Sequence, residues 1–236
     1  MTKKVLIVIP CYNEQASLPT LLHMLNNSLP VENYQIDVLV INDCSTDETK
    51  LVAKNNNVNL IDLPVNLGIG GAVQSGLIYA RDHKYDLAVQ MDGDGQHPPA
   101  ELKKLLECHQ KTAANIVIGS RFISKQGFQS SVLRRMGISY FHWLNRVFTG
   151  KSIYDSTSGF RLFDANALAL ASKYYPDDYP EPESLVFFSR AGLTIKETAV
   201  NMVERQGGKS SIRSFGPLYY CIKVTIAMFF SAIRKI

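Results

Sequence analysis

Short apolar runs alternate with amphipathic segments along the first half of the chain. The apolar runs predict β-strands at residues 5–9, 37–41, 58–63, 87–91 and 115–119. Between them, leucines recur at the spacing of one helix face, at Leu18, Leu21, Leu22 and Leu25 and again at Leu102, Leu105 and Leu106. Strands that alternate with helices form a parallel sheet covered on both faces. We therefore expect an α/β fold.

The second half of the chain has a less regular pattern. Residues 134–148 predict an aromatic-rich helix and 194–203 a late strand, whereas 155–163 and 179–183 are expected to be loops. The apolar run at 218–233 is interrupted by Lys223. It is shorter than the roughly 20 apolar residues that usually span a membrane. This run predicts either an amphipathic helix that docks on a membrane or partner, or an ordinary helix packed on the core.

Composition narrows the class of protein. The chain has 236 residues, of which 46% are hydrophobic, so it can bury a sizeable core. A net charge of +4 is far below that of an obligate nucleic-acid binder, and we expect no nucleic-acid partner. The four cysteines are scattered without a C-x-x-C pair, which favours reduced thiols over a disulfide framework or a zinc site. No signal-peptide pattern opens the chain, so we expect a cytoplasmic protein.

The strongest candidate chemistry is the segment LAVQMDGDGQHPP at 87–99, where an apolar strand runs into Asp92, Gly93 and Asp94. Carboxylates at the end of a buried strand are costly to desolvate unless a cation or donors meet them. Oxygen ligands of this kind suit Mg²⁺ or Mn²⁺ bound together with substrate phosphates. An acidic surface turn is the alternative. A calcium-binding EF-hand loop is excluded, because its fifth and twelfth positions would be Gln96 and Lys103.

Polar residues also follow the other predicted strands, at the edge where open α/β sheets bind ligands. Asp43 follows the second strand, where a carboxylate can accept an N–H of a nucleobase, while Asp47 suits a helix cap. Arg121 follows the fifth strand and can pair with a phosphate through two hydrogen bonds. A surface salt bridge is the alternative for Arg121.

A glycine-rich segment, NLGIGGAVQSG at 66–76, raises the question of a dinucleotide site. The G-x-G-x-x-G pattern fails, because its third glycine falls on Val73 and the segment follows the third strand, so a dehydrogenase is disfavoured. Phosphate binding at a helix start and close helix–sheet packing both stay open. Later segments offer a candidate base or acceptor-orienting group in Asp155, Glu181 or Glu183, and a basic loop around Arg205.

In this order, the motifs resemble those of inverting family 2 glycosyltransferases of the GT-A fold, most closely the bacterial dolichol- or polyprenyl-phosphate sugar synthase-like branch. The resemblance covers residues 5 to about 215 and is carried by PCYNE (10–14), NDCSTDET (42–49), 66–76, MDGDGQHPP (91–99), GSRF (119–122) and SGFRLF (158–163). It implies a catalytic domain at 1–215, with a mostly parallel sheet flanked by helices. A C-terminal amphipathic helical tail would follow at 216–236.

The resemblance also implies roles for individual residues. The nucleoside would be held by Pro10, Tyr12, Glu14 and Asp43. The metal, Mg²⁺ or Mn²⁺, would be held by Asp94 and Gln96, with Asp92 and Gly93 at the metal or ribose. Phosphates would meet Arg121, Arg134 and Arg205. The candidate catalytic residues are Asp94, Glu181, Glu183 and Asp155.

The implied activity is transfer of a sugar from a nucleotide sugar, with UDP weakly favoured over GDP, to a polyprenyl phosphate for cell-envelope glycans. Such an enzyme would act peripherally at the inner face of the cell membrane, either on the lipid surface or beside a small membrane protein. A homo-oligomer is also possible under this resemblance. Extension of a polysaccharide through a sugar hydroxyl is one alternative, and a non-catalytic membrane-docked scaffold is another. The sequence departs from this branch at two places. Position 69 is Ile69, where the branch often has a basic residue. The branch also often has clear C-terminal membrane helices, whereas this chain has only the short apolar run at 218–233.

Overall fold

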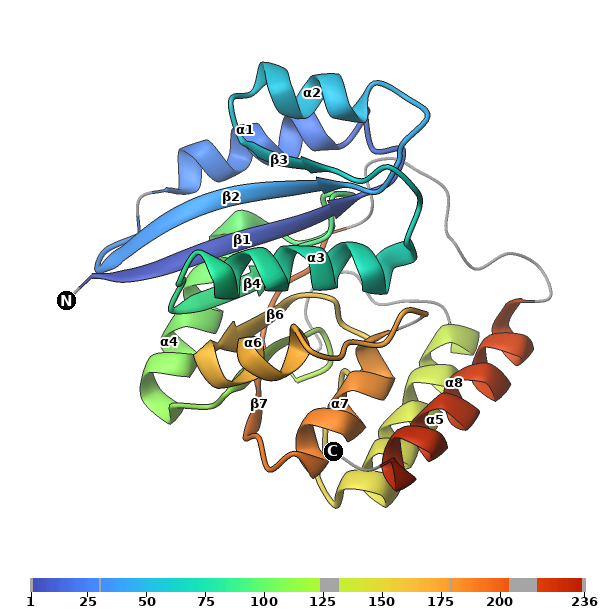
Figure 1. Ribbon diagram of the computed structural model, residues 1–236. Helices are drawn as coiled ribbons and strands as arrows, with labels where there is room; N and C mark the ends of the chain where they lie inside the picture. The colour runs from blue at the N-terminus through green and yellow to red at the C-terminus, as the bar shows by residue number, and fades with distance from the viewer. Residues whose placement is uncertain (1, 30, 124–131, 179, 204–215, 235–236) are drawn as a thin grey trace.

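A seven-stranded sheet in the order β3-β2-β1-β4-β6-β5-β7 forms the centre of the fold (Figure 1). The computed structural model describes residues 2–29, 31–123, 132–178, 180–203 and 216–234. The strands are β1 Lys3–Cys11, β2 Tyr34–Asn42, β3 Asn59–Asp62, β4 Leu87–Gln90, β5 Ile116–Ser120, β6 Arg161–Asp164 and β7 Ile195–Ala199. Strand β6 runs antiparallel to its neighbours β4 and β5, while the other pairs are parallel.

Helices cover both faces of this sheet. They are α1 Leu18–Ser28, α2 Thr49–Asn55, α3 Gly68–Asp82, α4 Leu102–Thr112, α5 Val132–Thr149, α6 Ala165–Ala171, α7 Pro180–Arg190 and α8 Gly216–Ile233. Side chains of β1 alternate between two buried clusters. Val5 and Ile7 pack with α1 and α4, whereas Leu6 and Val8 pack with α3, α6 and α7. A parallel strand buried on both faces needs a continuous run of apolar residues, and the sequence of β1 is such a run from Val5 to Ile9.

A smaller apolar cluster joins α5, α7 and α8 at one end of the molecule (Figure 1). Helix α8 contributes Val224 and Met228, which are buried against Phe141 of α5 and Val186 of α7. The C-terminal helix therefore has one side packed on the rest of the protein.

The predicted α/β class is confirmed, as are the predicted strands of the first half and the helix at 134–148. Two loop predictions are wrong in part, although residues 155–160 do form a loop. Residues 155–163 lead into the short central strand β6, which begins at Arg161, and 179–183 include the start of α7 at Pro180. Proline in the first turn with Glu181 and Glu183 beside it is a common helix-start pattern, so the sequence did carry a signal for α7.

Candidate active site

The carboxyl ends of β1, β2, β4 and β5 and the start of the antiparallel strand β6 meet at one edge of the sheet. Strand register places Cys11 beside Asn42, and it places Arg161 between Gln90 and Ile118. Residues just beyond these positions are therefore brought together, although they come from distant parts of the sequence. This edge is the location that open α/β sheets use for ligands.

The Asp92–Gly93–Asp94 turn is fixed tightly against β1. A Cβ atom added at Gly93 would lie 2.7 Å from Cys11 Sγ and 3.2 Å from the Pro10 carbonyl, so only glycine fits. Asp94 is 3% exposed, and its Oδ1 accepts a hydrogen bond from the Gln96 N–H at 2.9 Å. The Asp92 side chain is 32% exposed. The turn therefore presents one accessible and one buried carboxylate.

Two further residues shape the surroundings of Asp92, and our sequence analysis singled out neither. A Cβ atom at Gly159 would lie 2.9 Å from both Asp92 carboxylate oxygens, so the 158–160 segment approaches them closely. The buried His97 accepts the Asp92 N–H through Nδ1 at 3.1 Å and stacks on Phe160. Because Nδ1 is the acceptor, Nε2 carries the ring proton, 3.8 Å from Asp92 Oδ2. These contacts hold Asp92 in place.

The loops after β1 and β2 form the candidate nucleoside side of the site. The Asn13 side chain accepts the Thr46 N–H at 2.8 Å, and the Asn13 N–H donates to Ser45 Oγ at 3.0 Å. These bonds lock the two loops together. Tyr12 is 51% exposed, while Glu14 accepts the Ser17 hydroxyl at 2.6 Å.

Asp43 has a structural role that the sequence analysis did not anticipate. Its side chain is buried, and its two oxygens accept the backbone N–H groups of Leu67 at 2.7 Å and Gly68 at 3.0 Å, where α3 begins. Burial raises the pKa of Asp43, and these two hydrogen bonds oppose the rise. Each carboxylate oxygen has a second lone pair, so the group can cap the helix start and still accept from a ligand.

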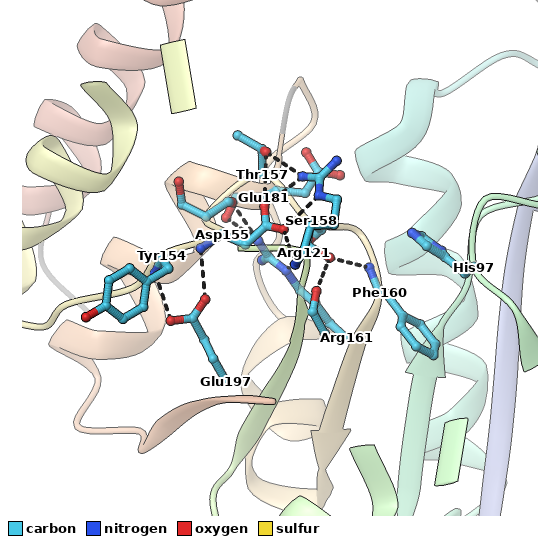
Figure 2. A network of polar contacts seen from close by, with 12 residues as sticks. His97, Arg121, Tyr154, Asp155, Thr157, Ser158, Phe160, Arg161, Glu181 and Glu197 are labelled. Atoms are coloured by element: carbon cyan, nitrogen blue, oxygen red, sulfur yellow. Dashed lines mark hydrogen bonds and ion pairs between the residues drawn. The ribbon is translucent and has the colours of Figure 1, made fainter. Parts of the chain in front are cut away.

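Arg121 and Asp155 form a two-point ion pair (Figure 2). Asp92 acts electrostatically on the same guanidinium. Asp155 is fully buried and Arg121 is 13% exposed. Glu197 accepts the backbone N–H groups of Tyr154 and Asp155, both at 2.8 Å, which fixes the loop that presents Asp155. Burial lowers the pKa of the Arg121 guanidinium, but Asp155, with smaller contributions from Asp92 and Glu181, more than offsets this effect, so the pKa is raised.

The other carboxylates proposed from the sequence separate in space. Glu181 is partly buried in the first turn of α7, and burial raises its pKa to about 6. The positive charges of Arg161 and Arg121 oppose this rise in pKa, and the negative charge of Asp92 adds to it. The Glu181 carboxylate therefore belongs to the same electrostatic cluster as Asp92 and Arg121. Glu183 instead accepts the Tyr174 hydroxyl at 3.0 Å, at a pocket lined partly by α8.

Two predicted phosphate contacts cannot be placed in this geometry. Arg134 belongs to α5, but its side chain lies outside the described part of the structure, and Arg205 lies outside the described residues altogether.

Comparison with known proteins now identifies the family. Residues 6–170 match the family described as Glycosyl transferase family 2. The chain belongs to this family and is a glycosyltransferase. It is 33% identical over 221 residues to the undecaprenyl-phosphate mannosyltransferase of Micrococcus luteus, covering 89% of this chain and 87% of that protein. It is 27% identical to the polyprenol monophosphomannose synthase of Mycolicibacterium smegmatis, covering 89% and 82%.

Solved structures support the same fold. Glucosyl-3-phosphoglycerate synthase from Mycobacterium tuberculosis, crystallised with Mn²⁺, UDP and glucosyl-3-phosphoglycerate, superposes with a TM-score of 0.71. The alignment covers 98% of the glycosyltransferase described here and 80% of that chain, at 19% identity. At 19% identity, this structural similarity establishes the fold alone.

The Asp92 turn of the glycosyltransferase has the donor set expected for a metal that is shared with a substrate. No group of three or more His, Cys, Asp or Glu side chains arranged to hold a metal ion occurs among the described residues. Mg²⁺-type ions are commonly held by only one or two carboxylates, because substrate phosphates and waters complete their coordination. Asp92 and Asp94 meet that smaller requirement.

Proposed function

We propose that this glycosyltransferase moves a sugar from a nucleotide sugar, with UDP favoured over GDP, to a polyprenyl phosphate. The observation that carries the proposal is the Asp92–Gly93–Asp94 turn beside the Arg121 guanidinium, at the ligand-binding edge of the sheet. That arrangement suits a nucleoside diphosphate with a divalent ion. The acceptor is inferred from the two bacterial relatives, whose names specify undecaprenyl phosphate and polyprenol monophosphomannose.

The donor would bind across the ends of β1, β2 and β4. Tyr12 would stack on the base, Asp43 would accept its N–H, and Pro10 and Glu14 would complete the nucleoside contacts. Asp92, Asp94 and Gln96 would hold Mg²⁺ or Mn²⁺, with Gly93 giving the turn its close approach to β1. When bound, the metal neutralises charge on the departing diphosphate. Arg121 would stabilise the same charge, and Arg134 and Arg205 are further candidates for phosphate contacts.

The reaction we propose is a single displacement with inversion. A phosphate oxygen of the acceptor forms the new bond to the anomeric carbon as the bond to the nucleoside diphosphate breaks. This nucleophile is already anionic, so the step needs no general base. The carboxylates of Asp155 and Glu183 are engaged with Arg121 and Tyr174, which leaves Glu181 to contact the transferred sugar or the acceptor.

Transfer to a sugar hydroxyl is the second candidate function, and one observation favours it. A hydroxyl nucleophile must lose its proton, and the efficiency of a base increases as its pKa approaches the operating pH. Glu181, with its pKa raised to about 6, lies in the electrostatic cluster around Asp92 and fits that role.

We further propose that residues 1–215 form the catalytic unit and that 216–236 dock it on the inner face of the membrane or on a small membrane protein. No helix in the described ranges is long and apolar enough to cross a membrane. Helix α8 nevertheless exposes apolar side chains at Tyr219, Ile222, Ile226, Phe229, Phe230 and Ile233, and α5 adds Trp143 and Val147. Lys223 and Arg234 are the cations proposed for anionic headgroups; in the free protein Lys223 pairs with Asp178 and Arg234 lies over the Tyr174 ring.

A product assay tests the function directly. The enzyme is incubated with labelled UDP- and GDP-sugars, undecaprenyl phosphate and Mn²⁺, with EDTA and Asp94→Ala as controls. We expect an organic-soluble product that mild acid releases, as a sugar monophosphate ester should. Label found only in acid-stable polysaccharide would instead establish the hydroxyl acceptor, with Glu181 as the leading base.

A further inference from the structure

Arg161, the first residue of β6, is a fully buried cation in an unfavourable place. It donates four hydrogen bonds, and every acceptor is a carbonyl or hydroxyl oxygen rather than a carboxylate. Burying a charge is costly unless it is paired. One acceptor is the carbonyl of Glu181 in the first turn of α7, and the positive end of the helix dipole disfavours a cation there. The hydrogen bonds of Arg161 therefore do not neutralise its charge.

The four hydrogen bonds connect three segments around the site (Figure 2). Nε donates to the Ser158 carbonyl at 2.8 Å and Nη2 to the Ser156 carbonyl at 2.9 Å, which fixes the loop before β6. Nη2 also donates to the Glu181 carbonyl and Nη1 to Ser184 Oγ, both at 2.9 Å, which fixes the start of α7. Ser184 in turn donates to the Glu181 carbonyl, so the contact forms a closed ring.

The position of Arg161 in the sheet relates this network to the chemistry. It pairs in register with Gln90, two residues before Asp92. The side chains of Arg161, Asp92 and Arg121 all act electrostatically on the Glu181 carboxylate. The buried guanidinium thus lies behind a site that contains at least two negative groups, for which it supplies a fixed countercharge.

We propose that Arg161 is a positioning residue of the transfer reaction, which fixes the first turn of α7 so that the Glu181 carboxylate faces the Asp92–Arg121 edge of the site. This inference rests on the proposed function, because it assigns Glu181 to the transferred sugar or the acceptor. Arginine is required because its planar fork reaches acceptors in the 156–158 loop and at the start of α7 at once, whereas a lysine ammonium is a single point.

A double-mutant cycle tests the coupling between the two residues. Arg161→Lys, Glu181→Gln and the double variant are compared for kcat and for donor and acceptor KM, with each rate normalised to UDP-binding sites. We expect each single change to lower kcat by about 10- to 100-fold, since small misplacements of reacting groups have effects of this size. Donor KM should stay within about twofold. The double variant should be no slower than Glu181→Gln, because the effect of Arg161 passes through Glu181.

Arg81→Lys is the matched control. Arg81 Nη1 also donates to a buried serine hydroxyl, Ser172 Oγ, at 2.8 Å, but it joins α3 to the end of α6. It should leave kcat unchanged alone and in combination with Glu181→Gln. If Arg161→Lys does not fold, the same cycle is run with Ser184→Ala, which removes one of the four acceptors, against Ser172→Ala.

Three results would overturn the proposal: wild-type kcat in folded Arg161→Lys, wild-type kcat in Glu181→Gln, or losses that multiply in the double variant. Failure of the proposed function would be seen in the product assay, where the wild-type enzyme would form no product from undecaprenyl phosphate. In that case the cycle is measured on metal-dependent hydrolysis of the donor, so the two failures stay distinct.

Discussion

Arg121 and Asp155 contact each other through both carboxylate oxygens, with Nε–Oδ2 and Nη2–Oδ1 distances of 2.7 Å. The Arg121 backbone N–H also donates to Asp155 Oδ2 at 3.0 Å. These bonds use the Nε and Nη2 side of the guanidinium and fix its plane. Asp155 therefore orients an arginine that we assign to the diphosphate, and we infer a structural role for this carboxylate in place of a catalytic one.

We predict that Asp155→Asn lowers the free energy of unfolding by about 3–5 kcal/mol, because it leaves a largely buried guanidinium without its counter-ion. Urea unfolding measures the change, and transferase activity should fall with it. Asp178→Asn is the control, since the Asp178–Lys223 pair is exposed and should contribute at most about 1 kcal/mol. Equal losses in both variants would contradict the assignment.

Asp94→Ala should abolish metal-dependent activity while the protein stays folded, because the change removes a buried anion together with a ligand. Thermal unfolding is measured with and without Mn²⁺ and UDP. Ligand at about 100 times its dissociation constant should stabilise the wild type by about 2.7 kcal/mol. Glu107→Ala, on the surface of α4, should keep the full stabilisation. A mutant that retains both the stabilisation and the activity would refute the metal site.

Asp43→Asn should raise the donor KM and also destabilise the protein. An amide cannot accept both the Leu67 and Gly68 N–H groups through equivalent oxygens, so the start of α3 loses a hydrogen bond worth about 1–3 kcal/mol. Asp47→Asn separates the two effects. Asp47 accepts from Thr49 and Gln15, and its loss should reduce stability without raising KM. A collapsed kcat at unchanged KM in Asp43→Asn would exclude a nucleoside-binding role.

The strand-end motifs were predictable because the apolar run of each strand is a local pattern in the sequence. A parallel strand buried on both faces appears as an apolar run, and the polar residues that follow it must lie at one edge. The partners of those residues were not predictable. Arg121 is paired with Asp155 and Asp43 with the start of α3, and these contacts depend on how loops far apart in sequence meet in space. Arg161 likewise gave no signal, because burial of a cation runs against its usual exposure.

The raised pKa of Glu181 predicts a pH dependence of stability. A carboxyl group that titrates at about 6 when folded, against its ordinary 4.5, binds protons more tightly in the folded state. Stability should therefore fall as pH rises from about 4.5 through 6. Glu181→Gln removes this titrating group and its pH-dependent contribution to stability, so it should stabilise the metal-free protein more at pH 7 than at pH 4. The difference is at most about 2 kcal/mol, and solvent reduces it.

Asp62→Asn supplies a control of opposite sign. Hydrogen bonds from Lys50 and Asn42 lower the pKa of Asp62, so its contribution is present at neutral pH and is lost as pH falls. Denaturant unfolding at several pH values measures both variants. Parallel pH profiles for wild type and Glu181→Gln would show that Glu181 does not titrate as predicted.

The docking surface is best tested by point changes on α8, because deletion of the helix would also uncover the cluster around Phe141 and Val186. Phe230 is 60% exposed, so Phe230→Asp should leave the fold intact while placing a charge on the docking face. Burial of one phenylalanine is worth about 1.5–3 kcal/mol, so binding to anionic lipid vesicles should fall at least tenfold.

Leu51→Asp, at a 50% exposed position on α2, is the matched control and should bind like wild type. If Phe230→Asp binds vesicles normally, α8 does not dock on lipid. If wild type binds cell membranes but not protein-free vesicles, the partner is instead a membrane protein.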